Sequence, residues 1–147
     1  PEEIIEWAKT EVDHYAVYFF ADDLKFFKHS GRVSGLTARL GNILGLRPII
    51  CMTSDGIMQS TGNAYGRSGA IKKIFNYLDI LGDDVPNHKI VIGHSDALNL
   101  ANEVIANLKM KYGDKLDIEI KAVNPTAGSH CGPDGVGICF HSKCREK

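Results

Sequence analysis

Lys89-Ile-Val-Ile-Gly-His-Ser-Asp96 is the stretch of this sequence that says most about its fold. Its β-branched residues predict a buried strand at residues 89–93, which continues through His94-Ser95-Asp96 into a helix at residues 97–111. Apolar and polar residues then alternate over residues 117–123, which predicts another strand of the core. A strand, a helix and a strand in succession favour a sheet packed with helices.

Outward from this unit, hydrophobic periodicity predicts the other elements of the chain. Strands are expected at residues 15–20, 48–52 and 136–140, and the Asp55-Gly56 turn predicts that 48–52 forms a hairpin with the residues that follow. Helices are expected at residues 1–12, 24–29, 36–44 and 68–81. Asp22 is the expected N-cap of the second of these helices. The pattern predicts an α/β (α+β) fold with a mixed β-sheet.

Length and composition limit the class of protein. The 147 residues suit one domain, or one lobe of a longer protein, and the first residue, Pro1, suggests a chain cut from something longer. Seventeen basic residues against 18 acidic ones leave a formal net charge of −1, which disfavours nucleic acid as a partner. No apolar run approaches the roughly 20 residues of a membrane span. Four unevenly spaced cysteines favour a reducing cytoplasm.

Two polar loops could carry chemistry. Ser30-Gly-Arg-Val-Ser-Gly35 places Arg32 between small residues, where a guanidinium could bind a carboxylate or phosphate. The residues alone favour a plain turn between helices, with the arginine pointing into water. His94-Ser95-Asp96 contains the residue types of a catalytic triad, but neighbours on a chain point in different directions. We interpret Ser95 or Asp96 as the N-cap of the following helix.

The most unusual segment is Asn124–Gly137, which is rich in glycine and proline. Pro133 could begin a helical turn whose free N–H groups point towards His130, an arrangement that would suit a carboxylate or phosphate. An ordinary connecting loop is the alternative. Cys139 and His141 lie near this segment, but the cysteine and histidine spacings match no usual zinc pattern, so no metal or other cofactor is expected.

The two glycine-containing loops, with the segments that follow them, resemble one known family. Lys28-His-Ser-Gly-Arg-Val-Ser34, the segment Leu40-Gly-Asn-Ile-Leu44 running into Arg47-Pro-Ile-Ile50, and His130-Cys-Gly-Pro-Asp-Gly-Val-Gly-Ile138 are similar in order and content to segments of the DegV family. The resemblance covers nearly the whole chain.

The resemblance implies a function. Members of the family are two-lobe proteins that enclose a long-chain fatty acid, and some present it to the catalytic subunit of a bacterial fatty acid kinase. This chain would be the carboxy-terminal lobe at residues 15–147, preceded by a lead-in helix at 1–14 and partnered by an amino-terminal lobe outside it. The lobe would bind lipid without being an enzyme.

The resemblance also implies roles for particular residues. His130 and Gly132 would lie near the fatty-acid carboxylate, and Arg32 and Arg67 would contact the kinase subunit or the phosphate. Candidates for the acyl-chain lining are Leu40, Ile43 and Leu44, although core packing explains these three equally well. The alternative function is a small acyl-transfer or hydrolytic enzyme that uses His130 and Cys131 as base and nucleophile.

Overall fold

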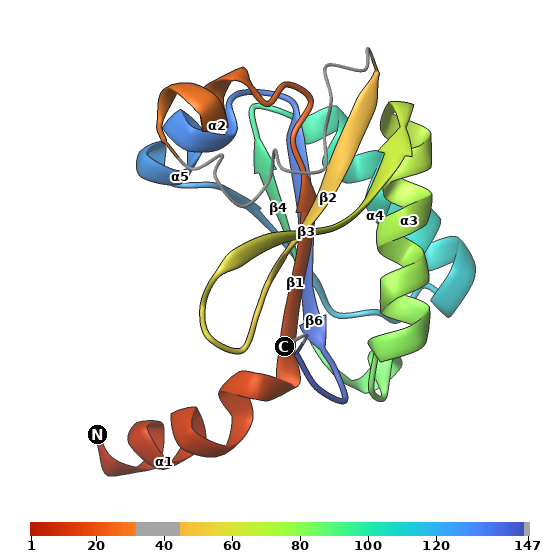
Figure 1. Ribbon diagram of the computed structural model, residues 1–147. Helices are drawn as coiled ribbons and strands as arrows, with labels where there is room; N and C mark the ends of the chain where they lie inside the picture. The colour runs from red at the N-terminus through yellow and green to blue at the C-terminus, as the bar shows by residue number, and fades with distance from the viewer. Residues whose placement is uncertain (32–44, 146–147) are drawn as a thin grey trace.

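The computed structural model describes residues 1–31 and 45–145, and these residues form a single mixed sheet with helices on both faces (Figure 1). The strands are β1 (Tyr15–Phe20), β2 (Leu46–Met52), β3 (Met58–Tyr65), β4 (Ile90–Ser95), β5 (Ile118–Ala122) and β6 (Gly135–His141). The α-helices are α1 (Glu2–Glu11), α2 (Lys25–His29), α3 (Gly66–Leu81), α4 (Leu98–Tyr112) and α5 (Pro125–Cys131). Two short 3-10 helices, η1 (Val12–His14) and η2 (Val85–Asn87), complete the described elements.

The strand order in the sheet is β3-β2-β1-β6-β4-β5. β4 and β5 pair in parallel because α4 connects them across one face, and the other neighbouring pairs are antiparallel. The hairpin of β2 and β3 turns at Thr53–Ile57, where Gly56 has a φ of 75°. The predicted mixed α/β fold and the predicted hairpin are both confirmed.

One face of the sheet carries the main core. Strand residues point alternately to the two faces, and the buried set on β1 is Ala16, Tyr18 and Phe20. These side chains join the apolar residues of α3 and α4 in one hydrophobic cluster. Burying a large apolar side chain contributes about 1.5–3 kcal/mol, so this face supplies most of the packing energy that holds the sheet and both long helices together.

The opposite face is covered only in part. α2 and α5 lie together at one end of it, on the other side of the sheet from α3 and α4 (Figure 1). A small cluster built on Ala21, Phe27 and Ile50 lies there, with Phe19, Leu24, Met58 and Cys131 packed against it. Gly132, at the end of α5, has a φ of 72°, and a Cβ at this position would lie 2.3 Å from Cδ2 of Phe26. Glycine therefore allows the close approach of α5 to α2.

Two predicted helix caps are wrong. Asp22 does not cap α2, because the N–H of Lys25 donates instead to Oδ1 of Asp23, at 2.8 Å. Neither Ser95 nor Asp96 caps α4, where the N–H of Ala97 donates to Nδ1 of His94, at 3.3 Å. Asp22 has tertiary partners and Ser95 lies on β4, which the local pattern of residue types does not reveal.

The expected helical turn at Pro133 is also absent. The helix of this segment is α5, which begins eight positions earlier at Pro125, and Oδ1 of Asn124 accepts the N–H of Ala127 at 2.8 Å as its N-cap. Asn124-Pro125 is itself a good helix start, and it competes with Pro133. His130 consequently lies in the last turn of a helix and not in front of one.

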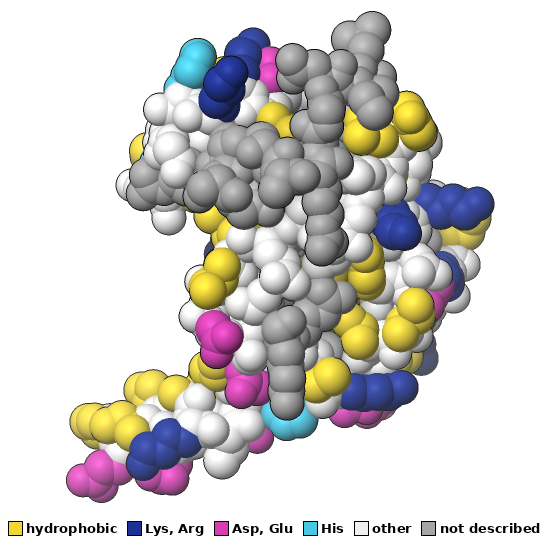
Figure 2. Space-filling view, in the orientation of Figure 1, with side chains coloured by type: hydrophobic (Ala, Val, Ile, Leu, Met, Phe, Trp, Pro, Cys, Tyr) yellow, Lys and Arg dark blue, Asp and Glu magenta, His cyan; other side chains and the backbone are white. Residues whose placement is uncertain are grey.

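The first helix projects from the body of the structure (Figure 1). Ile4, Ile5 and Trp7 are exposed on it, and hydrophobic side chains gather over α1 in Figure 2. The predicted helix at residues 1–12 is confirmed, while its role as a lead-in to another lobe stays a prediction. The predicted helix at 36–44 lies outside the described residues. Within residues 1–31 and 45–145, no helix has both the length and the apolar character needed to cross a bilayer.

Candidate functional site

The face of the sheet turned away from α3 and α4 carries a strip with little side-chain volume. On β4 the residues on this face are Val91, Gly93 and Ser95, and on the neighbouring β6 they are Gly135, Gly137 and Cys139. The pairing places Gly93 opposite Gly137, and Gly137 in turn opposite Phe19 of β1. The middle of the strip is therefore bare backbone on two adjacent strands.

A cavity of about 300 Å³ lies over this strip. Ala127 and Cys131, four residues apart on one face of α5, form one wall, and Met58 of β3 contributes from the hairpin. The lining residues are Val17, Phe19, Phe20, Met58, Val91, Gly93, Ser95, Val123, Ala127, Cys131, Gly135, Val136, Gly137, Ile138 and Cys139. Nearly all of these are apolar or glycine, so the cavity suits an apolar ligand of small-molecule size.

The two ends of the cavity differ in polarity. At one end Ser95 is buried, and its Oγ accepts the N–H of Gly135 at 3.1 Å. Within residues 1–31 and 45–145, this is the hydrogen bond that the hydroxyl makes, and it accepts in it. We call a row the set of paired residues, one from each strand, that point into the cavity; successive rows are two residues apart along a strand. Two rows from Ser95, about 13 Å away by the usual rise of a strand, the row consists of Val17, Val91 and Cys139. The cavity thus runs from a hydroxyl group to a purely apolar end.

His130 lies beside this cavity without lining it. It belongs to the last turn of α5, between the lining residues Ala127 and Cys131. Its side chain is half-buried, and its Nδ1 is buried with no hydrogen-bond partner within residues 1–31 and 45–145. A buried polar atom without a partner is uncommon and calls for an explanation, such as a ligand or a group supplied from elsewhere.

The two cysteines that line the cavity are held in the neutral thiol form. Burial raises the pKa of the Cys131 thiol and also that of the Cys139 thiol. A raised pKa lowers the fraction of thiolate, which is the nucleophilic form. Both side chains therefore act as small apolar groups, and Cys131 is poorly suited to the nucleophile of the alternative enzyme hypothesis.

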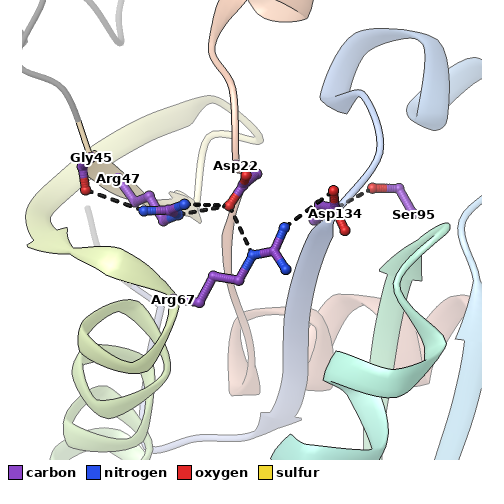
Figure 3. A network of polar contacts seen from close by, with 7 residues as sticks. Asp22, Gly45, Arg47, Arg67, Ser95 and Asp134 are labelled. Atoms are coloured by element: carbon purple, nitrogen blue, oxygen red, sulfur yellow. Dashed lines mark hydrogen bonds and ion pairs between the residues drawn. The ribbon is translucent and has the colours of Figure 1, made fainter.

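A network of ion pairs lies next to the Ser95 end of the cavity (Figure 3). Nε and Nη2 of Arg47 donate to Oδ1 of Asp22 at 2.8 and 2.6 Å, and Nε of Arg67 donates to the same oxygen at 3.1 Å. Nη2 of Arg67 lies 3.2 Å from Oδ2 of Asp134, the residue that precedes Gly135. The network joins the end of β1, the start of α3 and the turn before β6.

Electrostatics holds this network in its charged form. Burial opposes the charge on Asp22, but hydrogen bonds from Arg67 and Arg47 outweigh it and keep the pKa of the carboxyl below its ordinary value. The hydrogen bond to Asp22 likewise raises the pKa of Arg67. Since Arg67 contacts two carboxylates, its charge is compensated, and a third anion would have to displace Asp134 or share the guanidinium with it.

A second cavity, of about 330 Å³, is lined in part by Arg67 and Asp134. Residues 96–100, at the start of α4, complete its lining. Within the described ranges, no group of three or more histidine, cysteine or acidic side chains could hold a metal ion.

The predicted site residues are only partly brought together. His130 and Gly132 lie next to one another at the end of α5, and Arg67 lies in the ion-pair network. Arg32, Leu40, Ile43 and Leu44 lie outside the described residues. Sequence reasoning missed the lining on β4 and β6, although a signal existed: Gly93 and Gly137 interrupt β-branched strands, and strand glycines often mark a close approach.

A mixed sheet with an apolar cavity on one face and an ion-pair network at its end defines the class of this protein as an α/β lobe. The family described as "Uncharacterised protein, DegV family" matches residues 1–143, and the chain belongs to the DegV family. A DegV domain-containing protein of Clostridium perfringens is 28% identical over 145 residues, which cover 99% of this chain and 50% of that protein.

Solved structures share the fold. The chain is similar to DegV, a fatty acid binding protein from Bacillus subtilis, with 25% identity, a TM-score of 0.77, and coverage of 97% of this chain and 50% of that one. It is also similar to the Fatty Acid Kinase (Fak) B3 protein of Streptococcus pneumoniae, loaded with linoleic acid, with 12% identity, a TM-score of 0.74, and coverage of 95% and 49%. The chain therefore spans about half the length of the relatives it matches.

Proposed function

We propose that this chain binds a long-chain fatty acid, with the acyl tail in the cavity on the face of the sheet turned away from α3 and α4. The observation that carries the proposal is the apolar cavity itself, whose floor is the glycine strip of β4 and β6. Each methylene buried there contributes about 0.8 kcal/mol, so an elongated apolar tail gains affinity along the length of the strip. The fatty acid binding named for the Bacillus subtilis relative supports the choice of ligand.

The polarity of the cavity supports an orientation for the ligand. A carboxylate that leaves water needs hydrogen-bond donors, because burying it without partners costs several kcal/mol. The hydroxyl of Ser95 offers such a donor at one end, with His130 beside the cavity, and the row of Val17, Val91 and Cys139 offers none. The proposed head position is therefore the α5 end, near His130 and Gly132, with the tail pointing towards Val91.

The proposal assigns this chain half of a binding site. The relatives are about twice as long as the matched region, so an amino-terminal lobe outside these residues would close the cavity and add donors to the carboxylate. Residues 1–14 would then be the segment that leads from that lobe into this one. The exposed Ile4, Ile5 and Trp7 of α1 fit this arrangement, since a second lobe would cover them.

The proposal further assigns the bound acid to a kinase reaction. The catalytic subunit of a fatty acid kinase would phosphorylate the carboxylate, and Arg67 and Arg32 would contact that subunit or the phosphate. This chain would itself bind the acid without catalysing a reaction. The raised pKa of the Cys131 thiol argues against the acyl-transfer or hydrolytic alternative. A cytoplasmic location is part of the same proposal, and the four cysteines, which form no disulfide with one another, fit a reducing compartment.

Native mass spectrometry of the full-length protein purified from cells tests the binding. We expect a co-purified long-chain acid whose mass disappears after delipidation and returns on addition of hexadecanoic acid. Acyl phosphate formation on addition of ATP and the kinase catalytic subunit would then test the partner. Purified protein that carries no acid and takes up none after delipidation would overturn the proposed function, and turnover that is lost on alkylation of Cys131 would favour the enzyme alternative.

A further inference from the structure

Three strand glycines line the cavity, and two of them are required by the packing of the chain itself. Glycine within a strand lowers its stability, so each needs a physical reason. A Cβ on Gly137 would lie 2.5 Å from Cβ of Phe19, and a Cβ on Gly135 would lie 2.8 Å from Oγ of Ser95. Any side chain at these two positions would force the neighbouring strand or the buried serine to move.

Gly93 differs from the other two. A Cβ at this position would lie 3.8 Å from its nearest neighbour, Cγ1 of Val123, which is an ordinary van der Waals distance. The backbone of Gly93 is also not among the glycines with positive φ. Alanine would therefore fit without any shift and would stabilise the strand by reducing the freedom of the unfolded chain. The packing of the described residues gives no reason for glycine here.

We infer that Gly93 is a specificity-determining residue, whose missing side chain leaves room for the acyl tail to pass from the Ser95 end of the cavity to the apolar end. This inference rests on the proposed function and deepens it. Gly93 is the middle one of the three residues of β4 that line the cavity, with Ser95 one row away on one side and Val91 one row away on the other. Because the pairing places the bare backbone of Gly137 beside it, the passage is deepest at this row.

The length of the ligand is therefore decided at this row. A short acid ends before Gly93, whereas a long one lies across it. A methyl group at position 93 displaces about one methylene of a long tail, which corresponds to about fourfold weaker binding. A valine would fill the passage and weaken binding of long acids by about tenfold or more, with a smaller effect on acids that end before this row.

The test compares wild type, Gly93→Ala and Gly93→Val in the delipidated full-length protein. Isothermal titration calorimetry with butanoic, hexanoic, hexadecanoic and octadecanoic acid measures affinity, because one row is about 7 Å, which an extended acid of about six carbons spans. Thermal denaturation without ligand measures stability. Gly69→Ala is the matched control, because a Cβ at this position in α3 has its nearest neighbour at 3.6 Å and lies outside the cavity. Gly93→Ala tests the inference even if Gly93→Val fails to fold.

We expect Gly93→Ala to keep or raise the melting temperature while it weakens binding of octadecanoic acid, a combination that a purely structural role would not produce. Gly69→Ala should leave the affinities for all four acids unchanged. If the wild-type protein binds the long acids and Gly93→Ala binds them with the same affinity as wild type, this inference is overturned and the proposed function stands. A wild-type protein that binds none of the four acids would overturn both.

Discussion

Nη2 of Arg47 lies 2.6 Å from Oδ1 of Asp22, so that two residues 25 positions apart form an ion pair between β2 and the end of β1. Arg67 shares the same oxygen, and through Asp134 it extends the contact to the turn before β6 (Figure 3). This arrangement holds together the end of the sheet at which Ser95 and α5 bound the cavity.

Replacing Asp22 by asparagine should destabilise the protein. The side chains of Asp22 and Arg47 are only 27% and 15% exposed, so their hydrogen bonds are partly shielded from water. Loss of a charged acceptor at such a site costs about 1–2 kcal/mol, after allowance for its partial exposure. Urea denaturation of Asp22→Asn measures the change. The control is Asp23→Asn, whose ion pair with Lys25 is more exposed. Equal stability of Asp22→Asn and wild type would contradict the role of the network.

The same carboxylate should make stability depend on pH with a definite sign. The folded-state pKa of Asp22 lies below its ordinary value of about 3.9, so the unfolded chain binds the proton more readily. The stability that Asp22 contributes is therefore present above about pH 4 and is lost as the pH falls through the folded-state pKa. We expect the difference in melting temperature between wild type and Asp22→Asn to narrow as the pH falls below about 4. A difference that stays constant across this range would refute the assignment.

Gly137→Ala should destabilise the sheet, in contrast to alanine at position 93. The added Cβ would lie 2.5 Å from Cβ of Phe19, so β1 or β6 would have to move. Forcing an extra carbon into a packed site costs about 1–3 kcal/mol. Thermal denaturation of the ligand-free protein measures the change in melting temperature, with Gly69→Ala as the control variant. A melting temperature equal to that of wild type would show that the strands adjust at little cost.

His130→Ala should weaken retention of the fatty acid. Nδ1 of His130 is buried without a partner among the described residues, and a hydrogen bond to a carboxylate would use it. Such a bond contributes about 1.5–3 kcal/mol, which corresponds to about tenfold weaker binding or more. Titration of the delipidated full-length protein with hexadecanoic acid measures the loss. His29→Ala, an exposed histidine of α2, is the control. Unchanged affinity in His130→Ala would remove this residue from the proposed site.

Local patterns predicted the positions of most elements correctly. Tyr15–Phe20, Ile90–Ser95 and the hairpin turn at Gly56 are recognisable because alternation, β-branched residues and turn residues act within a few positions of one another. The caps were predicted less well. Asp22, Ser95 and Asp96 are good capping residues by type, but Asp22 pairs with two arginines and Ser95 accepts a hydrogen bond from a distant strand. Such partners come from remote parts of the chain, and a local pattern contains no information about them.

The sequence by itself determined that this chain is an α/β lobe, because apolar periodicity is a local property that each segment carries alone. Tertiary structure decided where the cavity lies. Val17, Gly93 and Cys139 come from three distant segments, and they share one face only because β6 inserts between β1 and β4 in a particular register. A shift of that register by one residue would turn these side chains to the opposite face. Long-range strand pairing therefore brings Gly93 and Gly137 together as the floor of a cavity.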